Sequence, residues 1–205
     1  MGTGTKIALV VIGVVVVVAI IFGGAIASTY NSLVGLDQGA QSQWGQVESA
    51  YQRRADLVPN LVATVKGAAN FEQSTLTAVT EARSKVGQVT TGAVENVARD
   101  PQAFARFQQA QDALSSALTR MMVVVERYPE LKATQGFRDL SAQLEGTENR
   151  ISVERMRFNL AAQAFNTKRD SFPTVLVAGF FGSRFQEKPY FKSQAGAEKA
   201  PEVKF

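Results

Sequence analysis

The chain contains no cysteine and no histidine. Without cysteine it can form neither a disulfide framework nor a thiolate site. Without histidine it cannot carry Ser-His or Cys-His nucleophile systems, His-containing zinc motifs, or the Glu-x-x-His di-iron site of helical bundles. Only an all-carboxylate metal site, or acid/base work by Asp, Glu, Lys or Tyr, remains open. We therefore expect no enzyme activity, no bound transition metal and no other cofactor.

Runs of basic residues are missing as well. The formal charge of +4 arises from 22 Lys and Arg against 18 Asp and Glu, and the basic residues are scattered thinly. Binding of nucleic acid requires a basic patch or stripe. The sequence therefore indicates no nucleic-acid partner.

The chain does contain one long apolar run without charge, Ile7 to Ala27. At about 1.5 Å per residue, a helix of that length crosses the roughly 30 Å hydrocarbon core of a bilayer. The valines at 14–18 favour a strand in water, but in lipid a helix satisfies its own backbone hydrogen bonds. We predict a transmembrane helix over 7–27 within a membrane anchor over residues 1–29, with the lipid bilayer as a partner.

A cleaved signal peptide is the alternative, since Ala25-Ile26-Ala27 offers a small-x-small cleavage site. The length of the apolar run favours a retained anchor. Lys6 precedes the run, and no Lys or Arg follows it until Arg53. The positive-inside rule then predicts a single-pass protein of the cell membrane with its folded part on the periplasmic or extracellular side; the cytoplasmic side is the alternative.

Beyond the anchor, apolar residues recur at three- and four-residue spacing almost throughout. A first seam runs from Trp44 to Val86, and Gly87 to Gly92 is typical of a loop. Asp100-Pro101 is a helix start that leads to Tyr128-Pro129, and a last helix is expected from Thr134 to about Ser171. The pattern predicts an all-α fold, with an N-terminal transmembrane helix followed by a long-helix, antiparallel, up-and-down bundle.

Pro59 leaves the course of this bundle, residues 30–172, open. A proline removes one intrahelical hydrogen bond and disfavours the helical conformation at Val58, so the chain could reverse there. The seam keeps its phase across the proline, which favours one long, kinked helix. A reversal at Pro59 would return the end of the last helix towards the bilayer, whereas we expect a continuous helix to send it away.

Several ordered motifs resemble those of the LemA family. They are Tyr30-Asn31-Ser32-Leu33-Val34, Trp44-Gly45-Gln46-Val47-Glu48, the stretch from Tyr51 to Val62, and Leu144-Glu145-Gly146-Thr147-Glu148-Asn149-Arg150-Ile151. The resemblance covers nearly the whole chain after residue 29. It implies a membrane-anchored bundle of four-helix type without enzyme activity, associated with bacterial envelopes and, in one branch, with internal membrane organelles. Phe158-Asn159 and Phe165-Asn166 depart from the family's usual Tyr-Asn pair.

Polar residues near the seams are candidates for structure or interaction. Glu145 and Glu148 could share a cation, but Asn149 and Arg150 can neutralise them within the helix. We favour the structural interpretation, because buried polar groups can fix the register of a bundle.

A second polar group surrounds the proline. The side chains of Arg54, Asp56 and Asn60 could satisfy the carbonyl groups that the kink frees, and docking of a partner is the alternative. Farther along, Arg83 and Glu154 fall on apolar seams at nearly the same predicted height, which permits an ion pair between them.

The tail over residues 173–192 differs from the bundle. Phe172-Pro173 ends the last helix, and Thr174 to Gly182 is apolar but too short to span a bilayer. The tail mixes basic residues with five aromatic ones, Phe180, Phe181, Phe185, Tyr190 and Phe191. We expect these to fold onto the bundle; an interfacial membrane contact or a subunit contact is the alternative. Residues 193–205 are polar and expected to be disordered.

These features predict a membrane-anchored, non-enzymatic helical scaffold of the bacterial envelope. It would assemble with itself as a homo-oligomer, or with another envelope membrane protein, and serve membrane organisation. The alternative is an adaptor or regulatory subunit of a membrane enzyme such as a protease. Large homomeric particles in detergent would favour the scaffold, and a stable monomer that needs a partner would favour the adaptor.

Overall fold

The computed structural model describes residues 2–67, 71–91 and 97–192, and within these ranges the chain is helical and has no strand. Four long helices are α1 (Thr3–Lys66), α2 (Gln73–Thr91), α3 (Pro101–Val125) and α5 (Gln135–Asp170). The shorter elements are α4 (Pro129–Lys132), α6 (Thr174–Phe181) and the 3-10 turn η1 (Gly182–Phe185). The expected all-α class is confirmed. The expectation of disorder over 193–205 falls outside the described residues.

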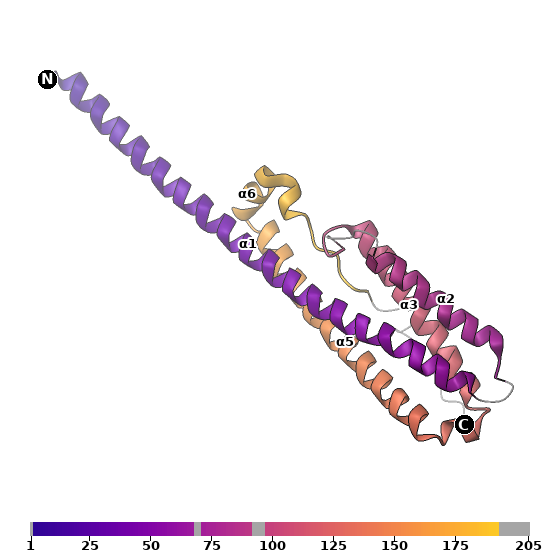
Figure 1. Cartoon of the computed structure of the whole chain (residues 1–205). Helices are drawn as coiled ribbons and strands as arrows, with labels where there is room; N and C mark the ends of the chain where they lie inside the picture. Colours follow the sequence, from indigo (N-terminus) through magenta and orange to yellow (C-terminus); the bar gives the residue numbers. More distant parts are fainter. Residues whose placement is uncertain (1, 68–70, 92–96, 193–205) are drawn as a thin grey trace, which may run out of the picture.

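α1 is a single helix of 64 residues that contains Pro59. Figure 1 shows it running from the N-terminus along the length of the bundle. The chain therefore does not reverse at the proline. The seam does not continue to Val86 in one helix, however, because α1 ends at Lys66 and α2 begins at Gln73. Apolar spacing is the same on both sides of this connection, so the phase of the seam could not reveal it.

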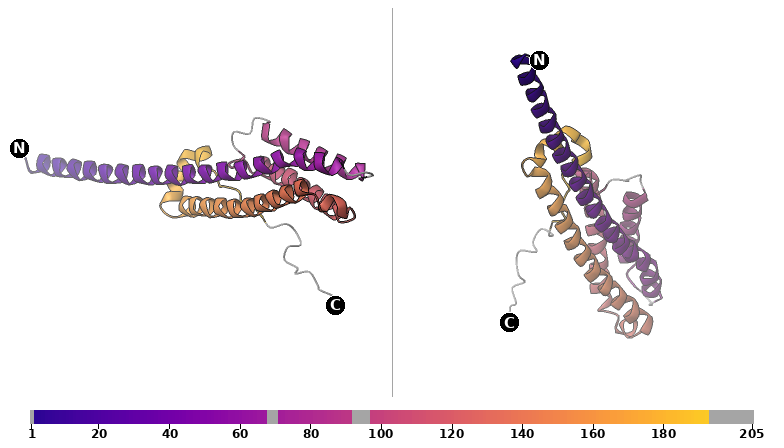
Figure 2. Two further views of the ribbon diagram at one scale, coloured as in Figure 1. Left: turned by 60° about the horizontal axis from the view of Figure 1, so that its bottom comes forward. Right: turned by 90° about the vertical axis from the view of Figure 1, so that its left-hand side faces the viewer.

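The connection between α1 and α2 reverses the direction of each long helix that follows, relative to our expectation. α2 packs on α1 and α3, and α5 packs along α1. The direction of the chain alternates from one long helix to the next, so the end of α5 returns towards the apolar part of α1. Figure 2 shows α6, which follows α5, lying beside α1 where α1 leaves the bundle. Our expectation that a continuous helix at Pro59 sends the end of α5 away was wrong, because it missed this additional reversal.

The glycine-containing stretch after Val86 was also misjudged. α2 continues through Gly87 to Thr91. A glycine inside a helix costs only about 1 kcal/mol relative to alanine, and Val86 and Val89 continue the packed seam there. The other helix ends follow the sequence signals. Asp100 caps α3 by accepting from two backbone N–H groups, and Thr134 caps α5.

The core runs the length of the bundle in three clusters. The cluster far from the N-terminus contains Leu61, Leu114 and Met121. The middle cluster is aromatic, with the Trp44 ring centroid 5.1 Å from that of Phe107 and with Phe104, Phe158 and Phe191 around it. The third contains Leu33, Phe165, Ala178 and Phe185. Each fully buried Leu, Met or Phe side chain stabilises the fold by roughly 1.5 to 3 kcal/mol.

The apolar segment of α1 lies outside all three clusters. Its large side chains, from Ile7 to Ile26, are exposed. By length and composition this segment can cross a membrane, and no other described helix can. The bundle therefore begins where the apolar run ends.

Candidate functional site

The tail returns along the outside of the bundle. Residues 186–192, here called the strap, have no regular secondary structure, and two asparagines of α5 hold their backbone. Asn166 donates from Nδ2 to the carbonyl of Lys188 and accepts from its N–H through Oδ1, both at 2.9 Å. Asn159 makes the same pair of bonds with Phe191, at 3.0 and 2.9 Å. The two side chains therefore act like backbone partners in a sheet ladder.

The spacing of the two asparagines explains why this arrangement fits. Asn159 and Asn166 are seven residues apart on α5, which is about 10.5 Å along the helix axis. Lys188 and Phe191 are three residues apart on an extended chain, which is about 10 Å. The two intervals match, so both amides bind the strap without strain.

Lys188 reaches from the strap to α1. Its Nζ donates to Oδ1 of Asp37, and Nη2 of Arg99 donates to Oδ2 of the same carboxylate at 2.6 Å. The side chains of Lys188 and Asp37 are almost fully buried. Burial lowers the pKa of Lys188 because it disfavours the charged ammonium, and the Asp37 carboxylate opposes that effect. One buried carboxylate therefore joins α1, the strap and the segment before α3.

The five aromatic candidates of the tail divide into two groups. Phe185 and Phe191 are buried against the bundle, as we expected. Phe181 and Tyr190 are more exposed but also contact the bundle, Phe181 with its ring centroid 4.8 Å from that of Tyr30 and Tyr190 through its hydroxyl, which accepts from Asn166 at 2.9 Å. Phe180 stands apart, because it is 86 % exposed. For Phe180 the expectation of packing on the bundle is wrong, because α6 turns its buried face, Thr174 and Ala178, inward.

Pro59 frees the carbonyl of Ala55, four residues earlier, because proline has no N–H to bond it. The side chain that satisfies this carbonyl comes from α2: Nε of Arg83 donates to the Ala55 oxygen at 3.0 Å. We had expected Arg54, Asp56 or Asn60 to take this role. Asp56 instead accepts from Gln52, and Asn60 accepts through its carbonyl from Thr64.

Arg54 is buried at the centre of the bundle and bonds to two other helices. It donates to Oε1 of Gln111 and to Oγ of Ser115 on α3, both at 2.6 Å, and to Oε1 of Glu148 on α5 at 2.8 Å. Its guanidinium also lies 5.0 Å from the ring centroid of Tyr51. Burial raises the pKa of Tyr51, and the charges of Arg155 and Arg54 oppose that effect. Arg54 therefore links α1 to both α3 and α5.

The remaining seam candidates stay apart. Arg83 lies ten residues after the start of α2, whereas Glu154 lies nineteen residues after the start of α5. The two positions therefore differ by about 13 Å along the axis of the bundle. No ion pair therefore joins them within the described part of the chain. Glu154 is buried between Arg157, at 3.1 Å, and Arg150, at 3.9 Å.

The Glu145 group does not form a cation site. Glu148 pairs with Arg54, Glu145 and Asn149 are exposed, and Arg150 turns towards Glu154. Within the described residues, no cluster of three or more acidic side chains could hold a metal ion. Of this group, Glu148 has a partner on another helix and Arg150 has one on α5 itself.

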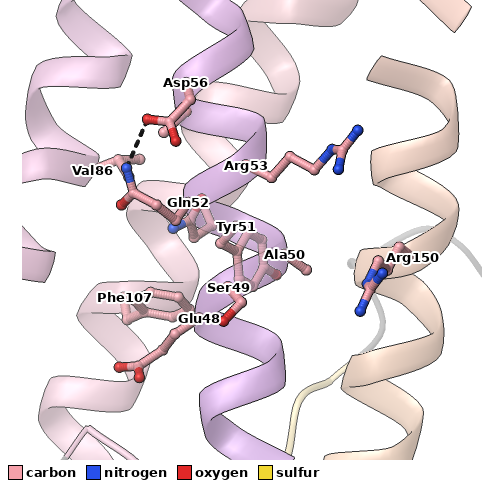
Figure 3. A pocket seen from close by; sticks show the side chains of 12 residues that line it. Glu48, Ser49, Ala50, Tyr51, Gln52, Arg53, Asp56, Val86, Phe107 and Arg150 are labelled. Carbon is pink, nitrogen blue, oxygen red and sulfur yellow. Dashed lines mark hydrogen bonds between the residues drawn. The ribbon is translucent and has the colours of Figure 1, made fainter. Parts of the chain in front are cut away.

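A groove of about 690 Å³, lined by both polar and apolar side chains, follows α1 from Glu48 to Asp56. Figure 3 shows Asp56 and its partner Gln52 on the side of α2, and Arg53 on the side of α5, where Arg150 lies. Acidic and basic side chains alternate along the groove, so its charge favours neither an anion nor a cation.

Sequence reasoning missed Asp37, Lys188 and the clamping role of the two asparagines. A signal for the asparagines was present, since Phe-Asn occurs at 158–159 and again at 165–166, seven residues later. Nothing in the sequence pairs Asp37 with Lys188, which lie 151 positions apart.

The chain was compared with known proteins. The family model described as "LemA family" matches residues 43–205. Magnetosome protein MamQ 2 of Paramagnetospirillum magneticum is 28 % identical over 207 residues, covering 92 % of this chain and 75 % of that protein. Magnetosome protein MamQ of Magnetospirillum gryphiswaldense is 27 % identical with the same coverage. Protein LemA of Metamycoplasma hominis is 26 % identical over 148 residues, or 72 % of this chain and 63 % of that protein. Because the family model covers most of the bundle and the tail, the chain belongs to the LemA family.

Proposed function

We propose that the protein is a membrane-anchored, non-enzymatic scaffold whose copies associate through the outer face of α5. Its long helices act as a rigid antiparallel up-and-down bundle of four-helix type on the periplasmic or extracellular side. The observation that carries the proposal is an exposed apolar stripe on α5. Val153, Met156 and Leu160 are 40, 56 and 58 % exposed, and their spacing of three and four residues puts them on one face of the helix.

The charges beside this stripe are occupied within their own chain. Arg157 pairs with Glu154 at 3.1 Å. Arg155 donates to the carbonyl of Lys192 at 2.9 Å and lies 4.7 Å from the ring centroid of Phe191. A second copy can therefore cover the stripe without separating Arg157 from Glu154, or Arg155 from the Lys192 carbonyl and the Phe191 ring.

Membrane anchoring also favours this face for self-association. Copies held in one membrane by the same helix present identical residues at the same height. A two-fold axis along the membrane normal then brings each stripe against its own copy, which is the self-complementary contact of symmetric dimers. Met156 lies in the middle of the stripe and would meet Met156 of the second copy.

The family supports the membrane setting of the proposal. Two of the matched relatives are named as magnetosome proteins, and this chain has an apolar helix long enough to cross a bilayer. The absence of histidine and cysteine from the sequence supports a role without catalysis.

Single cysteines test the contact, because the natural chain has none. Met156→Cys in full-length protein in native membranes should give a disulfide-linked dimer on mild oxidation, since identical positions face each other. Val123→Cys is the matched control: Val123 is also apolar and exposed, but it lies on α3. Equal cross-linking of both variants would indicate random collision and contradict the proposed contact. A monomer in detergent and in membranes would favour the adaptor function.

A further inference from the structure

One face of α6 is buried against the bundle, and the opposite face, here called the bare face, is exposed. Thr174 and Ala178 are buried where α6 meets α1 and α5. On the other side Leu176 is 65 % exposed, and Phe180 and Val175 are exposed too. The helix contains no charged residue. A rigidly held, apolar surface of this kind fits contact with lipid.

The bare face of α6 and the apolar segment of α1 enclose a cleft of about 440 Å³. α1 contributes Phe22, Ala25 and Ile26, and α6 contributes Leu176 and Phe180 among others. Of the residues that line the cleft, only Thr29 has a polar side chain. The cleft therefore offers almost no hydrogen bonds and suits a hydrocarbon chain.

The height of the cleft agrees with a lipid occupant. Phe22 lies five residues before Ala27, the end of the apolar run, or about 7.5 Å below it along the helix. Interfacial helices bury their apolar face about 5 to 10 Å into the boundary between head groups and acyl chains. α6 therefore lies at the depth where the acyl chains of one leaflet begin.

A cation lies just above the cleft. The guanidinium of Arg184 is 5.8 Å from the ring centroid of Tyr30, and Tyr30 is about 4.5 Å beyond the end of the apolar run. Arg184 is exposed and forms no ion pair with any residue that the structure describes. The nearby Arg169 is occupied, because it bonds the Phe185 carbonyl and Asp170. Arg184 thus retains donors for a phosphate.

We propose that the cleft between α1 and α6 holds an acyl chain of a phospholipid from the leaflet on the side of the bundle, with Arg184 at its phosphate. This inference rests on the membrane anchor of the proposed function and not on self-association through α5.

Depth measurement tests the position of α6. Nitroxide labels are placed on single cysteines at Phe180, at Ile12 in the anchor, and at Val123 in the bundle, in the full chain reconstituted into nanodiscs of phosphatidylethanolamine and phosphatidylglycerol. Labels at positions 12 and 180 should collide more with oxygen than with a water-soluble nickel complex, and the label at 123 should do the reverse.

The other labelling patterns overturn the inference in distinguishable ways. A label at 180 that contacts nickel, while 12 contacts oxygen, would show that α6 lies in water and that only this inference fails. A label at 180 shielded from both would show that protein covers the patch. A water-exposed label at 12 would remove the anchor and with it the proposed function.

Photochemical cross-linking tests the occupant. Phosphatidylglycerol with a diazirine in its acyl chain should attach to residues 22–29 and 174–181 of the full chain in nanodiscs. Arg184→Gln should lower the yield there several-fold, whereas Arg127→Gln, an exposed arginine at the far end of the bundle, should not. Attachment confined to residues 7–21, or a yield that Arg184→Gln leaves unchanged, would contradict a phospholipid in the cleft.

Discussion

Asp37 ties the strap to α1, and its carboxylate accepts from both Lys188 and Arg99. Removing its charge leaves Lys188 buried without compensation, whereas removing Lys188 leaves Asp37 paired with Arg99. We expect Asp37→Asn to lower the free energy of unfolding by about 3 to 5 kcal/mol and Lys188→Met to cost clearly less. Denaturant unfolding of the full chain in detergent, followed by fluorescence of its single tryptophan, measures both. Equal losses would show that Arg99 does not compensate Asp37.

Arg83 and Pro59 form a second testable pair of residues. Arg83→Met should cost about 1 to 3 kcal/mol, because it leaves the Ala55 carbonyl without a partner. In a Pro59→Ala background the alanine N–H can bond that carbonyl, so the same change should cost much less. A double-mutant cycle on unfolding free energies gives the coupling. Strict additivity would mean that Arg83 does not replace the missing backbone bond.

The raised pKa of Tyr51 predicts that the folded protein loses stability at alkaline pH. Its folded pKa is raised by burial above the ordinary value of 10.0, so the folded state keeps the proton that the unfolded state loses. The stability from this group is fully present below 10.0 and is lost as pH rises through the folded pKa. Tyr51→Phe should therefore lose less stability than the natural chain between about pH 9 and pH 11. The lowered pKa of Lys188 acts in the opposite direction in both proteins, so their difference isolates Tyr51. Identical pH profiles would contradict this assignment.

At the scale of elements, the strap is held by side chains that bond its backbone, so its release should be local. Asn159→Ala should speed hydrogen exchange at the Phe191 N–H, which loses its acceptor, and affect the Lys188 N–H much less. Asn166→Ala should produce the reverse pattern. Exchange measured residue by residue separates the two clamps. Uniform acceleration along the strap in both variants would show that it opens as one unit.

The ends of elements could be predicted where one residue carries the signal. Asp100 and Thr134 cap their helices as their side-chain chemistry requires. The connection after Lys66 could not be predicted, because the apolar spacing keeps its phase across a short turn. Gly87 was wrongly assigned to a loop, because helices tolerate a single glycine. Because this connection was missed, Arg83 was predicted at the height of Glu154, which it does not reach. The site was less predictable than the fold, since a pair such as Asp37 and Lys188 depends on where the whole chain returns.

At the scale of the molecule, the side of the membrane remains a prediction that cysteine labelling can check. With the bundle outside the cell membrane, a membrane-impermeant maleimide should label Val123→Cys in intact cells or spheroplasts. Thr3→Cys, on the other side of the apolar run, should react only after permeabilisation. The opposite pattern would place the bundle in the cytoplasm.

In the proposed membrane-anchored protein, the continuity of α1 would couple the bundle mechanically to the bilayer. No connection interrupts the helix between the apolar run and Lys66, so the anchor and the bundle share one stiff axis. The part of α1 beyond Ala27 is about 58 Å long, and a change of 10° in its inclination would move the far end by about 10 Å. Helices adjust their inclination to hydrocarbon thickness. A change in bilayer thickness that altered the inclination of α1 would therefore displace the far end of the bundle sideways.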